Sequence, residues 1–265
     1  MYKIEDITNQ IICGDCVEVM KEIPEESIDM VLTSPPYDNL RVYDGFSFNF
    51  KNTANELYRI LKSGGTIVWV VGDATIDGSE TGTSFEQALY FKSIGFKLHD
   101  TMIYYKNFFQ VGSGNPTRYH NNFEYIFILV KGKIKTFNGI KDRKNVVTGQ
   151  MKAGQVRQKD GSILTRPGNF VLEYGLRNNI WKYEVGGCKT TMDHVEHPAM
   201  FPEKLAQDHI ISWSNKEDIV LDPFNGSGTT TKIAKKLCRN YIGIEISQKY
   251  VDIAKSRLRQ DVLQI

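Results

Sequence analysis

The sequence predicts an α/β fold with a doubly wound, mostly parallel central sheet and helices on both faces. Residues 220–237 have the pattern of a strand, a glycine-rich loop and a helix, the order found where such sheets bind ligands. Apolar runs at residues 28–32 and 65–73 are typical of buried strands. A strand-like segment at residues 10–13 provides a further strand for the same sheet.

Composition limits the class of protein. At 265 residues with 41% hydrophobic side chains, the chain can form one well-buried α/β domain with an inserted element. It has no run of 18 apolar residues and no signal-peptide pattern, so we expect a cytoplasmic protein without a membrane segment. Cys13 and Cys16 form a single C-x-x-C pair, which cannot close a tetrahedral zinc site, and no metal is expected.

The order of the strands indicates a circular permutation. A doubly wound sheet needs a further strand beside the one that ends at Glu245, but only a helix over residues 247–260 follows it. The N-terminal strand at residues 10–13 supplies the missing element. We therefore expect the two termini to lie near each other.

The remaining elements follow from local patterns. Residues 84–94 predict an amphipathic helix with Ser84 as N-cap and Gln87 at the capping-box position. Its apolar residues are Phe85, Ala88, Leu89 and Phe91. Residues 101–106 and 124–131 are rich in Val, Ile and Tyr and predict strands. A polar loop at residues 111–120 joins them.

The glycine loop indicates the kind of ligand. Gly226 and Gly228 allow positive φ and close approach of a ligand, and the helix N-terminus behind them offers unpaired N–H groups. No Lys follows Gly228, which argues against a P-loop, and Thr231 replaces the third glycine of a dinucleotide fingerprint. Glu245, about 20 residues further on, suits two ribose hydroxyls. The pattern predicts an adenosine-like ligand without a pyrophosphate clamp.

A second motif, Thr-Ser-Pro-Pro-Tyr, follows the strand at residues 28–32. The two prolines leave the carbonyls of Pro35 and Pro36 without strand partners, while Ser34 adds a hydroxyl and Tyr37 a flat ring. Hydrogen-bond acceptors beside an aromatic ring suit the binding of a planar base, because the acceptors can bond to its exocyclic amine while the ring stacks on the base. A turn that simply ends the strand is the alternative, and the glycine loop downstream favours the functional interpretation.

Together the two motifs resemble the amino-methylating DNA methyltransferases that use S-adenosylmethionine, in particular their circularly permuted group. The resemblance covers nearly the whole chain, because Asp15 matches the acid near the cofactor adenine, residues 55–65 match a helix and turn before the next strand, and residues 197–205 match the segment over the methionine end of the cofactor. It implies a Rossmann-like methyltransferase fold, with a catalytic half at residues 1–130, a target-recognition insert at residues 131–190 and a cofactor-binding half at residues 191–265.

The resemblance also implies the site residues. The catalytic residues are Ser34, Pro35, Pro36 and Tyr37. The cofactor-binding residues are Asp15, Cys16, Thr33, His197, Pro198, Phe201, Pro202, Asp222, Pro223, Phe224, Asn225, Gly226, Ser227, Gly228, Thr229, Thr230 and Glu245.

The expected chemistry is direct methyl transfer to a base turned out of the duplex. Ser34 Oγ and the Pro35 carbonyl would accept the amine hydrogens and favour a pyramidal, nucleophilic nitrogen, while Tyr37 would stack on the base. Because the donor methyl is already activated, positioning matters more than acid–base catalysis. The absence of a Pro-Cys pair argues against ring-carbon methylation. In this family Ser before Pro-Pro-Tyr favours cytosine N4, with adenine N6 as the alternative.

The positive charge is concentrated in one segment. Residues 131–182 hold 12 Lys and Arg against three acids, a net charge of +9, which leaves −7 for the rest of the chain. Such a run can be an ordinary solvated face. Here Phe137, Phe170, Tyr174 and Trp181 are interleaved with it, which suits DNA binding. The expected DNA-binding residues are Arg118, Lys141, Arg143, Lys144, Arg157 and Arg166.

Double-stranded DNA is therefore the expected partner, in a bacterial or phage setting that the family resemblance implies. A nicotinamide oxidoreductase, an RNA or protein methyltransferase and a catalytically inactive DNA-binding module are the other classes considered. A cognate restriction endonuclease, and a monomer or a homodimer, remain open from the sequence.

Overall fold

The computed structural model describes residues 2–36, 48–106, 117–184 and 201–260. They divide into two compact units, which we call the main unit (Met1–Asn138 with Asn179–Ile265) and the insert unit (Gly139–Asn178). The insert unit lies within the range predicted for the target-recognition insert.

The main unit is built on an eight-stranded sheet in its described part. Strand β7 runs antiparallel to both of its neighbours and every other adjacent pair is parallel, which confirms the mostly parallel sheet. In spatial order the strands are β1 (Gln10–Cys13), β14 (Asn240–Glu245), β13 (Ile219–Asp222), β2 (Ile28–Thr33), β3 (Leu61–Val71), β7 (Phe123–Lys131), β6 (Phe96–Lys106) and β12 (Ile180–Tyr183).

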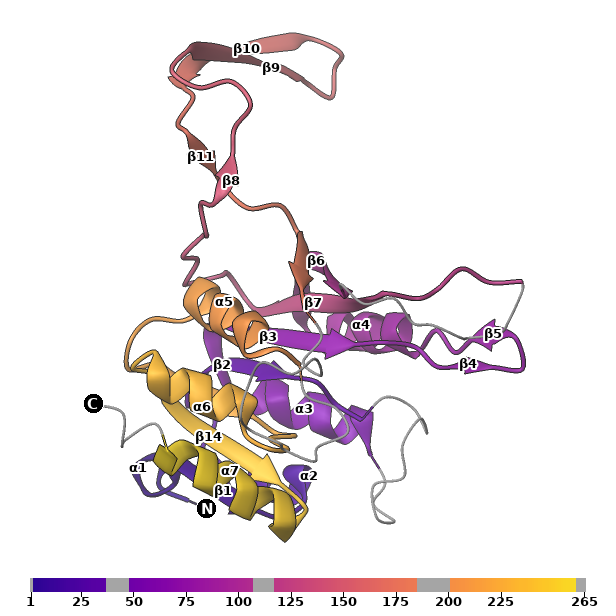
Figure 1. Ribbon diagram of the computed structural model, residues 1–265, viewed down its shortest axis with the longest axis vertical. Coiled ribbons are helices and arrows are strands. Elements are labelled where there is room, and N and C mark those ends of the chain that lie inside the picture. Colours follow the sequence, from indigo (N-terminus) through magenta and orange to yellow (C-terminus); the bar gives the residue numbers. More distant parts are fainter. Residues whose placement is uncertain (1, 37–47, 107–116, 185–200, 261–265) are drawn as a thin grey trace. The chain divides into compact units, whose positions relative to one another are not determined.

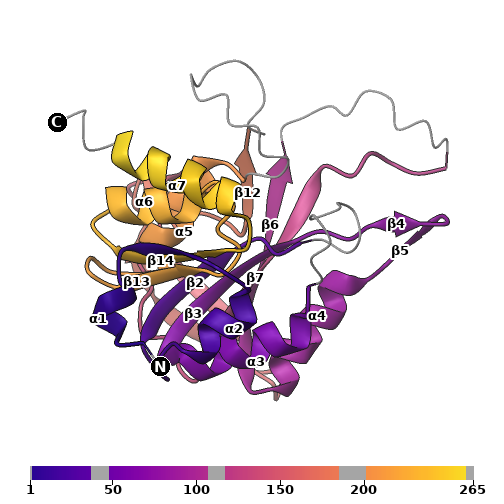
Figure 2. The ribbon, with the colours of Figure 1, turned by 90° about the horizontal axis from the view of Figure 1, so that it is seen from below.

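Helices cover both faces of this sheet, as predicted, and bury its central strands. Figure 2 shows α5 (Glu203–Trp213), α6 (Thr229–Lys236) and α7 (Gln248–Gln260) on one face. The other face carries α2 (Cys16–Lys21), α3 (Phe50–Ile60) and α4 (Thr83–Ser93), and a short α1 (Ile4–Ile7) precedes β1. None of the helices described is long and apolar enough to cross a membrane.

The permuted order of strands is confirmed by the pairing of the first strand with the last. Strand β1 pairs in parallel with β14, with Cys13 opposite Glu245, and helix α7 packs against both strands. In Figure 1 the indigo N-terminal strand lies beside these yellow C-terminal elements. The N-terminal segment thus completes the sheet next to the strand that ends in Glu245.

The predicted start of α4 is wrong, because its cap comes from a distant residue. The helix begins one residue before Ser84, with Gly82 as N-cap at φ 72°. The Ser84 amide and hydroxyl donate to the Asp73 carboxylate at 2.7 and 2.6 Å. The sequence pattern predicted that the Ser84 hydroxyl would accept bonds from the first amides of the helix. In the structure the acceptor is instead the carboxylate of Asp73, which follows the end of β3.

The predicted amphipathic pattern of α4 is confirmed only in part. Gln87 is buried and its Oε1 accepts a bond of 2.8 Å from Trp69 Nε1 instead of completing a capping box. Ala88 and Phe91 are buried, as predicted, whereas Phe85 and Leu89 remain 49% and 64% exposed. One further boundary differs, because β3 begins at Leu61 directly after α3, where a turn to residue 65 was expected.

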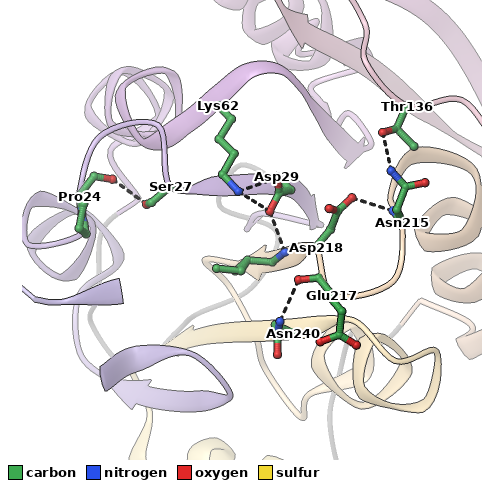
Figure 3. A network of polar contacts seen from close by, with 10 residues as sticks. Pro24, Ser27, Asp29, Lys62, Thr136, Asn215, Glu217, Asp218 and Asn240 are labelled. Atoms are coloured by element: carbon green, nitrogen blue, oxygen red, sulfur yellow. Dashed lines mark hydrogen bonds and ion pairs between the residues drawn. The ribbon is translucent and has the colours of Figure 1, made fainter. Parts of the chain in front are cut away.

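A polar network ties the amino ends of the parallel strands together (Figure 3). The Asp29 carboxylate on β2 accepts two bonds of 2.8 Å from Lys62 Nζ on β3 and one of 2.9 Å from the Ile219 amide on β13. Asp218 accepts from the Asn215 amide at 2.7 Å. These bonds hold three neighbouring strands in register at the edge opposite their carboxyl ends.

The insert unit is a set of short antiparallel pairs with few buried side chains. Strand β12 lies within the predicted insert range of residues 131–190 but pairs with β6 in the main sheet, because Trp181 and Tyr183 are buried there. Within the insert unit, β8 (Arg143–Lys144) pairs with β11 (Tyr174–Gly175), and β9 (Met151–Arg157) pairs with β10 (Ile163–Phe170). A hairpin of β4 (Thr75–Ile76) and β5 (Ser79–Glu80) belongs to the main unit.

Candidate active site

Neighbouring parallel strands end at the same edge of the main sheet. Asp15 follows β1, Glu245 ends β14, Asp222 ends β13 and Ser34 follows β2. Carboxyl ends of parallel strands are where doubly wound folds bind ligands. The sheet therefore brings the two sequence motifs together, although about 190 residues separate them along the chain.

A buried bond joins the two motifs. Thr33 Oγ1 donates to Asp222 Oδ1 at 2.6 Å, and the Phe224 amide donates to the same oxygen at 3.1 Å. Burial raises the pKa of Asp222 to about 6, against the effect of hydrogen bonds from Thr33, Thr230 and the Phe224 amide, which lower it. The bond fixes the end of β2, and with it Ser34, beside the glycine loop.

Both loop glycines adopt the predicted positive φ. Gly226 has φ 50° and Gly228 has φ 84°. A Cβ on Gly228 would lie 2.8 Å from Ala254 Cβ, so close packing of α7 also requires glycine there. Packing within the protein therefore requires glycine at position 228 in addition to the positive φ.

Glu245 is held by the loop itself. Its Oε2 accepts from the Gly226 amide at 2.8 Å and its Oε1 from the Ser247 amide at 2.9 Å. The side chain is half-buried. A carboxylate offers about four acceptor sites, so each oxygen can accept a further bond from a hydroxyl.

Asn225 presents a buried donor next to this carboxylate. Its Oδ1 accepts from Thr231 Oγ1 at 3.0 Å, while its Nδ2 has no hydrogen-bond partner among the described residues. The side chain packs so closely on β14 that a Cβ on Gly243 would lie 2.7 Å from its Cγ. Buried donors without partners are rare and are often completed by water or a ligand.

Asp15 and Cys16 lie at the start of α2. Asp15 Oδ1 caps this helix by accepting from the amides of Val17 and Glu18 at 2.9 and 3.1 Å. Burial raises the pKa of the Cys16 thiol to about 11, so this thiol stays protonated at neutral pH and is a poor nucleophile.

The acceptor motif after β2 is only partly accessible. Ser34 and Pro36 are half-buried and Pro35 is buried. Tyr37, His197 and Pro198 lie outside the described residues.

Two more predicted cofactor residues, Phe201 and Pro202, stand before α5. Both are half-buried, and Pro202 is the N-cap residue of the helix. On the glycine loop, Phe224 meets Phe48 edge to face, with ring centroids 5.2 Å apart. The other predicted loop residues are buried, namely Pro223, Ser227, Thr229 and Thr230.

Sequence reasoning missed two residues at this site. Phe48 lies between Phe46 and Phe50 in a stretch that belongs to neither motif. Arg257 lies on α7, yet its guanidinium donates to the Ser227 carbonyl at 2.8 Å. An arginine in a charged helix carries no local signal of burial, so only the packing of α7 reveals it.

The predicted DNA-binding residues divide between the units. Arg118 belongs to the main unit and pairs with Glu80 at 3.6 Å. The others lie in the insert unit and are exposed, namely Lys141, Arg143, Lys144, Arg157 and Arg166. The insert unit has eight Lys and Arg against three acids, a net charge of +5.

The interleaved aromatic residues behave differently from one another. Phe170 and Tyr174 of the insert unit are 61% and 44% exposed. Trp181 on β12 is buried and stacks on His209, with ring centroids 4.6 Å apart. Trp181 is therefore a core residue of the main unit.

The strand order, the glycine loop and the acid at the end of β14 together define a Rossmann-like α/β protein. In this fold Ser34 follows a strand that ends beside the strand leading into the glycine loop. A DNA methylase family matches residues 28–256 of the chain. The orphan methyltransferase M.BamHII of Bacillus amyloliquefaciens is 54% identical over 250 residues, which cover 92% of this chain and 94% of that protein. The DNA adenine methyltransferase YhdJ of Escherichia coli (strain K12) is 30% identical over 252 residues, covering 94% and 82%.

The fold is shared with solved structures as well. The M1.HpyAVI–SAM complex superposes with a TM-score of 0.62 at 26% identity, covering 94% of this chain and 99% of that one. The chain belongs to the N6/N4 DNA methylase family. Its fold is the Rossmann-like methyltransferase fold in circularly permuted order, which confirms the predicted resemblance and fold class.

Proposed function

We propose that this DNA methyltransferase transfers a methyl group from S-adenosylmethionine to the exocyclic N4 of cytosine in double-stranded DNA. The bond of 2.6 Å between Thr33 Oγ1 and Asp222 Oδ1 carries the proposal. It joins the strand end that presents Ser34 to the strand end that opens the glycine loop. In this proposal, Ser34 would accept from the amine next to a glycine loop that would bind the nucleoside part of the cofactor.

The residues at the strand ends fit S-adenosylmethionine, the ligand with which M1.HpyAVI was solved. Glu245 would accept the ribose hydroxyls, since each of its oxygens has capacity beyond its backbone bond. Asn225 Nδ2 is a donor still without a partner among the described residues. Asp15 would lie near the adenine, and Phe201 and Pro202 near the methionine end. When bound, the cofactor supplies a methyl group activated by its sulfonium centre.

Ser34 and Pro35 would prepare the base. Their hydroxyl and carbonyl oxygens would accept the amine hydrogens, which draws the nitrogen lone pair out of conjugation and toward the methyl group. Tyr37 would stack on the base, which must leave the duplex to be reached. The neutral Cys16 thiol is not needed, because direct transfer uses no covalent enzyme intermediate.

Adenine N6 is the second candidate, favoured by the 30% identity to an adenine methyltransferase. Ser34 before Pro-Pro-Tyr supports cytosine. The test is to digest DNA methylated by the purified protein to nucleosides and identify the product by mass spectrometry. We expect N4-methylcytosine. Finding N6-methyladenine alone would reverse the choice of base and leave the transfer mechanism standing.

We also propose that the insert at residues 131–190 recognises the target DNA, between a catalytic half at residues 1–130 and a cofactor half at residues 191–265. Exposed cations and the net charge of +5 on the insert unit support it. Similarity to a methyltransferase described as an orphan supports activity without a cognate endonuclease. A location in the bacterial cytoplasm and a monomer or a homodimer are part of the same proposal.

A further inference from the structure

Arg257 is a buried cation that none of the sequence motifs includes. It is 6% exposed, whereas arginine side chains are rarely buried unless they are paired. Nη1 donates to the carbonyl and the hydroxyl of Ser227 at 2.8 and 3.2 Å, and Nη2 donates to Glu203 Oε1 at 2.9 Å. Its Nε has no hydrogen-bond partner in the part of the chain that is described. One guanidinium thus joins the glycine loop to the start of α5.

Glu203 connects three helices through its side chain. It is the first residue of α5, directly after Pro202, and the same Oε1 accepts from Lys232 Nζ of α6 at 3.0 Å. Arg257 contributes from α7. The carboxylate therefore links both flanking helices to the segment assigned to the methionine end of the cofactor.

The arrangement acts on the most adaptable part of the loop. Ser227 stands between Gly226 and Gly228, and glycine allows many backbone conformations. In the conformation that the structure shows, the Gly226 amide donates to Glu245 Oε2 at 2.8 Å. Two bonds from a rigid guanidinium to Ser227 restrict the loop to that conformation.

Stability alone does not account for such a residue. The Arg257–Glu203 pair is only partly buried, because the Glu203 side chain is 44% exposed, and such a pair contributes little net stability. Orientation of the loop carbonyl requires a directed donor, which an apolar residue lacks.

We propose that Arg257 is a positioning residue for the cofactor, acting through Ser227 to hold the glycine loop and through Glu203 to align the segment before α5. The proposal rests on the cofactor site assigned above. Arg257 itself contacts neither cofactor nor DNA in this assignment. Its loss is expected to raise the Kd and the KM for S-adenosylmethionine while leaving the KM for DNA unchanged.

The test compares Arg257→Met, Arg257→Lys and the control Arg259→Met, which removes an exposed cation from the same helix. Calorimetry measures the Kd for S-adenosylmethionine, and fluorescence anisotropy measures DNA binding without cofactor. We expect Arg257→Met to weaken cofactor binding about tenfold, equivalent to about 1.4 kcal/mol. Arg257→Lys should fall between wild type and Met, because lysine keeps the charge but cannot bond both partners. The control should match wild type.

Each outcome decides the proposal. A folded Arg257→Met protein with wild-type cofactor affinity would overturn it. If that variant does not fold, Glu203→Ala, which removes the shared acceptor, must still weaken cofactor binding, and unchanged affinity would equally overturn the proposal. Wild-type protein that fails to bind S-adenosylmethionine would refute the cofactor assignment itself, which separates the two failures.

Discussion

Replacing Asp222 by Asn should change how stability depends on pH. The Asp222 carboxyl is 3% exposed, and burial raises its pKa from 3.8 to about 6. Asparagine keeps an oxygen that can accept from Thr33 Oγ1 and the Phe224 amide, but it does not titrate. The variant therefore removes one ionisation and retains the acceptor that joins the two motifs.

The sign and size follow from the two pKa values. Because the folded protein holds the proton to higher pH than the unfolded chain, this group stabilises the fold fully below about pH 4. That contribution is lost as the pH rises through about 6. At 1.36 kcal/mol for each pKa unit, the loss is about 3 kcal/mol.

The measurement is urea unfolding of both proteins at several pH values between about 4 and 7.5. We expect the free energy of unfolding of wild type, minus that of Asp222→Asn, to fall by about 3 kcal/mol across this range and then level off. Subtraction removes the other titrating groups, which the two proteins share. A difference that stays flat, or that rises with pH, would refute the assignment of a raised pKa to Asp222.

Three further predictions concern ligands. Glu245→Ala should weaken S-adenosylmethionine binding by more than about tenfold in calorimetry, since the variant cannot accept hydrogen bonds from the ribose, and unchanged affinity would remove Glu245 from the site. Ser34→Ala should abolish most tritiated methyl incorporation with unaltered cofactor affinity; full incorporation would place catalysis elsewhere. Reversing the charges of Lys141, Arg143 and Lys144 should make the slope of log K for DNA binding against log salt concentration less negative. The change should be roughly 0.9 for each phosphate that the variant no longer neutralises, whereas charges that face only solvent would leave the slope unchanged.

The sequence by itself determined the order and nature of the ligand-binding strands. Gly226 and Gly228 indicate a loop with positive φ. Residues 10–13 have the pattern of a strand, and this strand pairs with the one that ends at Glu245. These features are local, because backbone conformation at glycine and strand patterning depend on neighbouring residues. The motif order and the permuted fold could therefore be predicted before any tertiary packing was known.

Only the tertiary structure decided which partners the polar side chains have. Asp73 caps α4 in place of Ser84, Trp181 of the charged segment enters the core, and Arg257 of a charged helix is buried under the glycine loop. In each case the partner lies far away in the chain, and burial depends on how elements pack. A sequence pattern indicates which residue can donate or accept, but the choice of partner belongs to the packed fold.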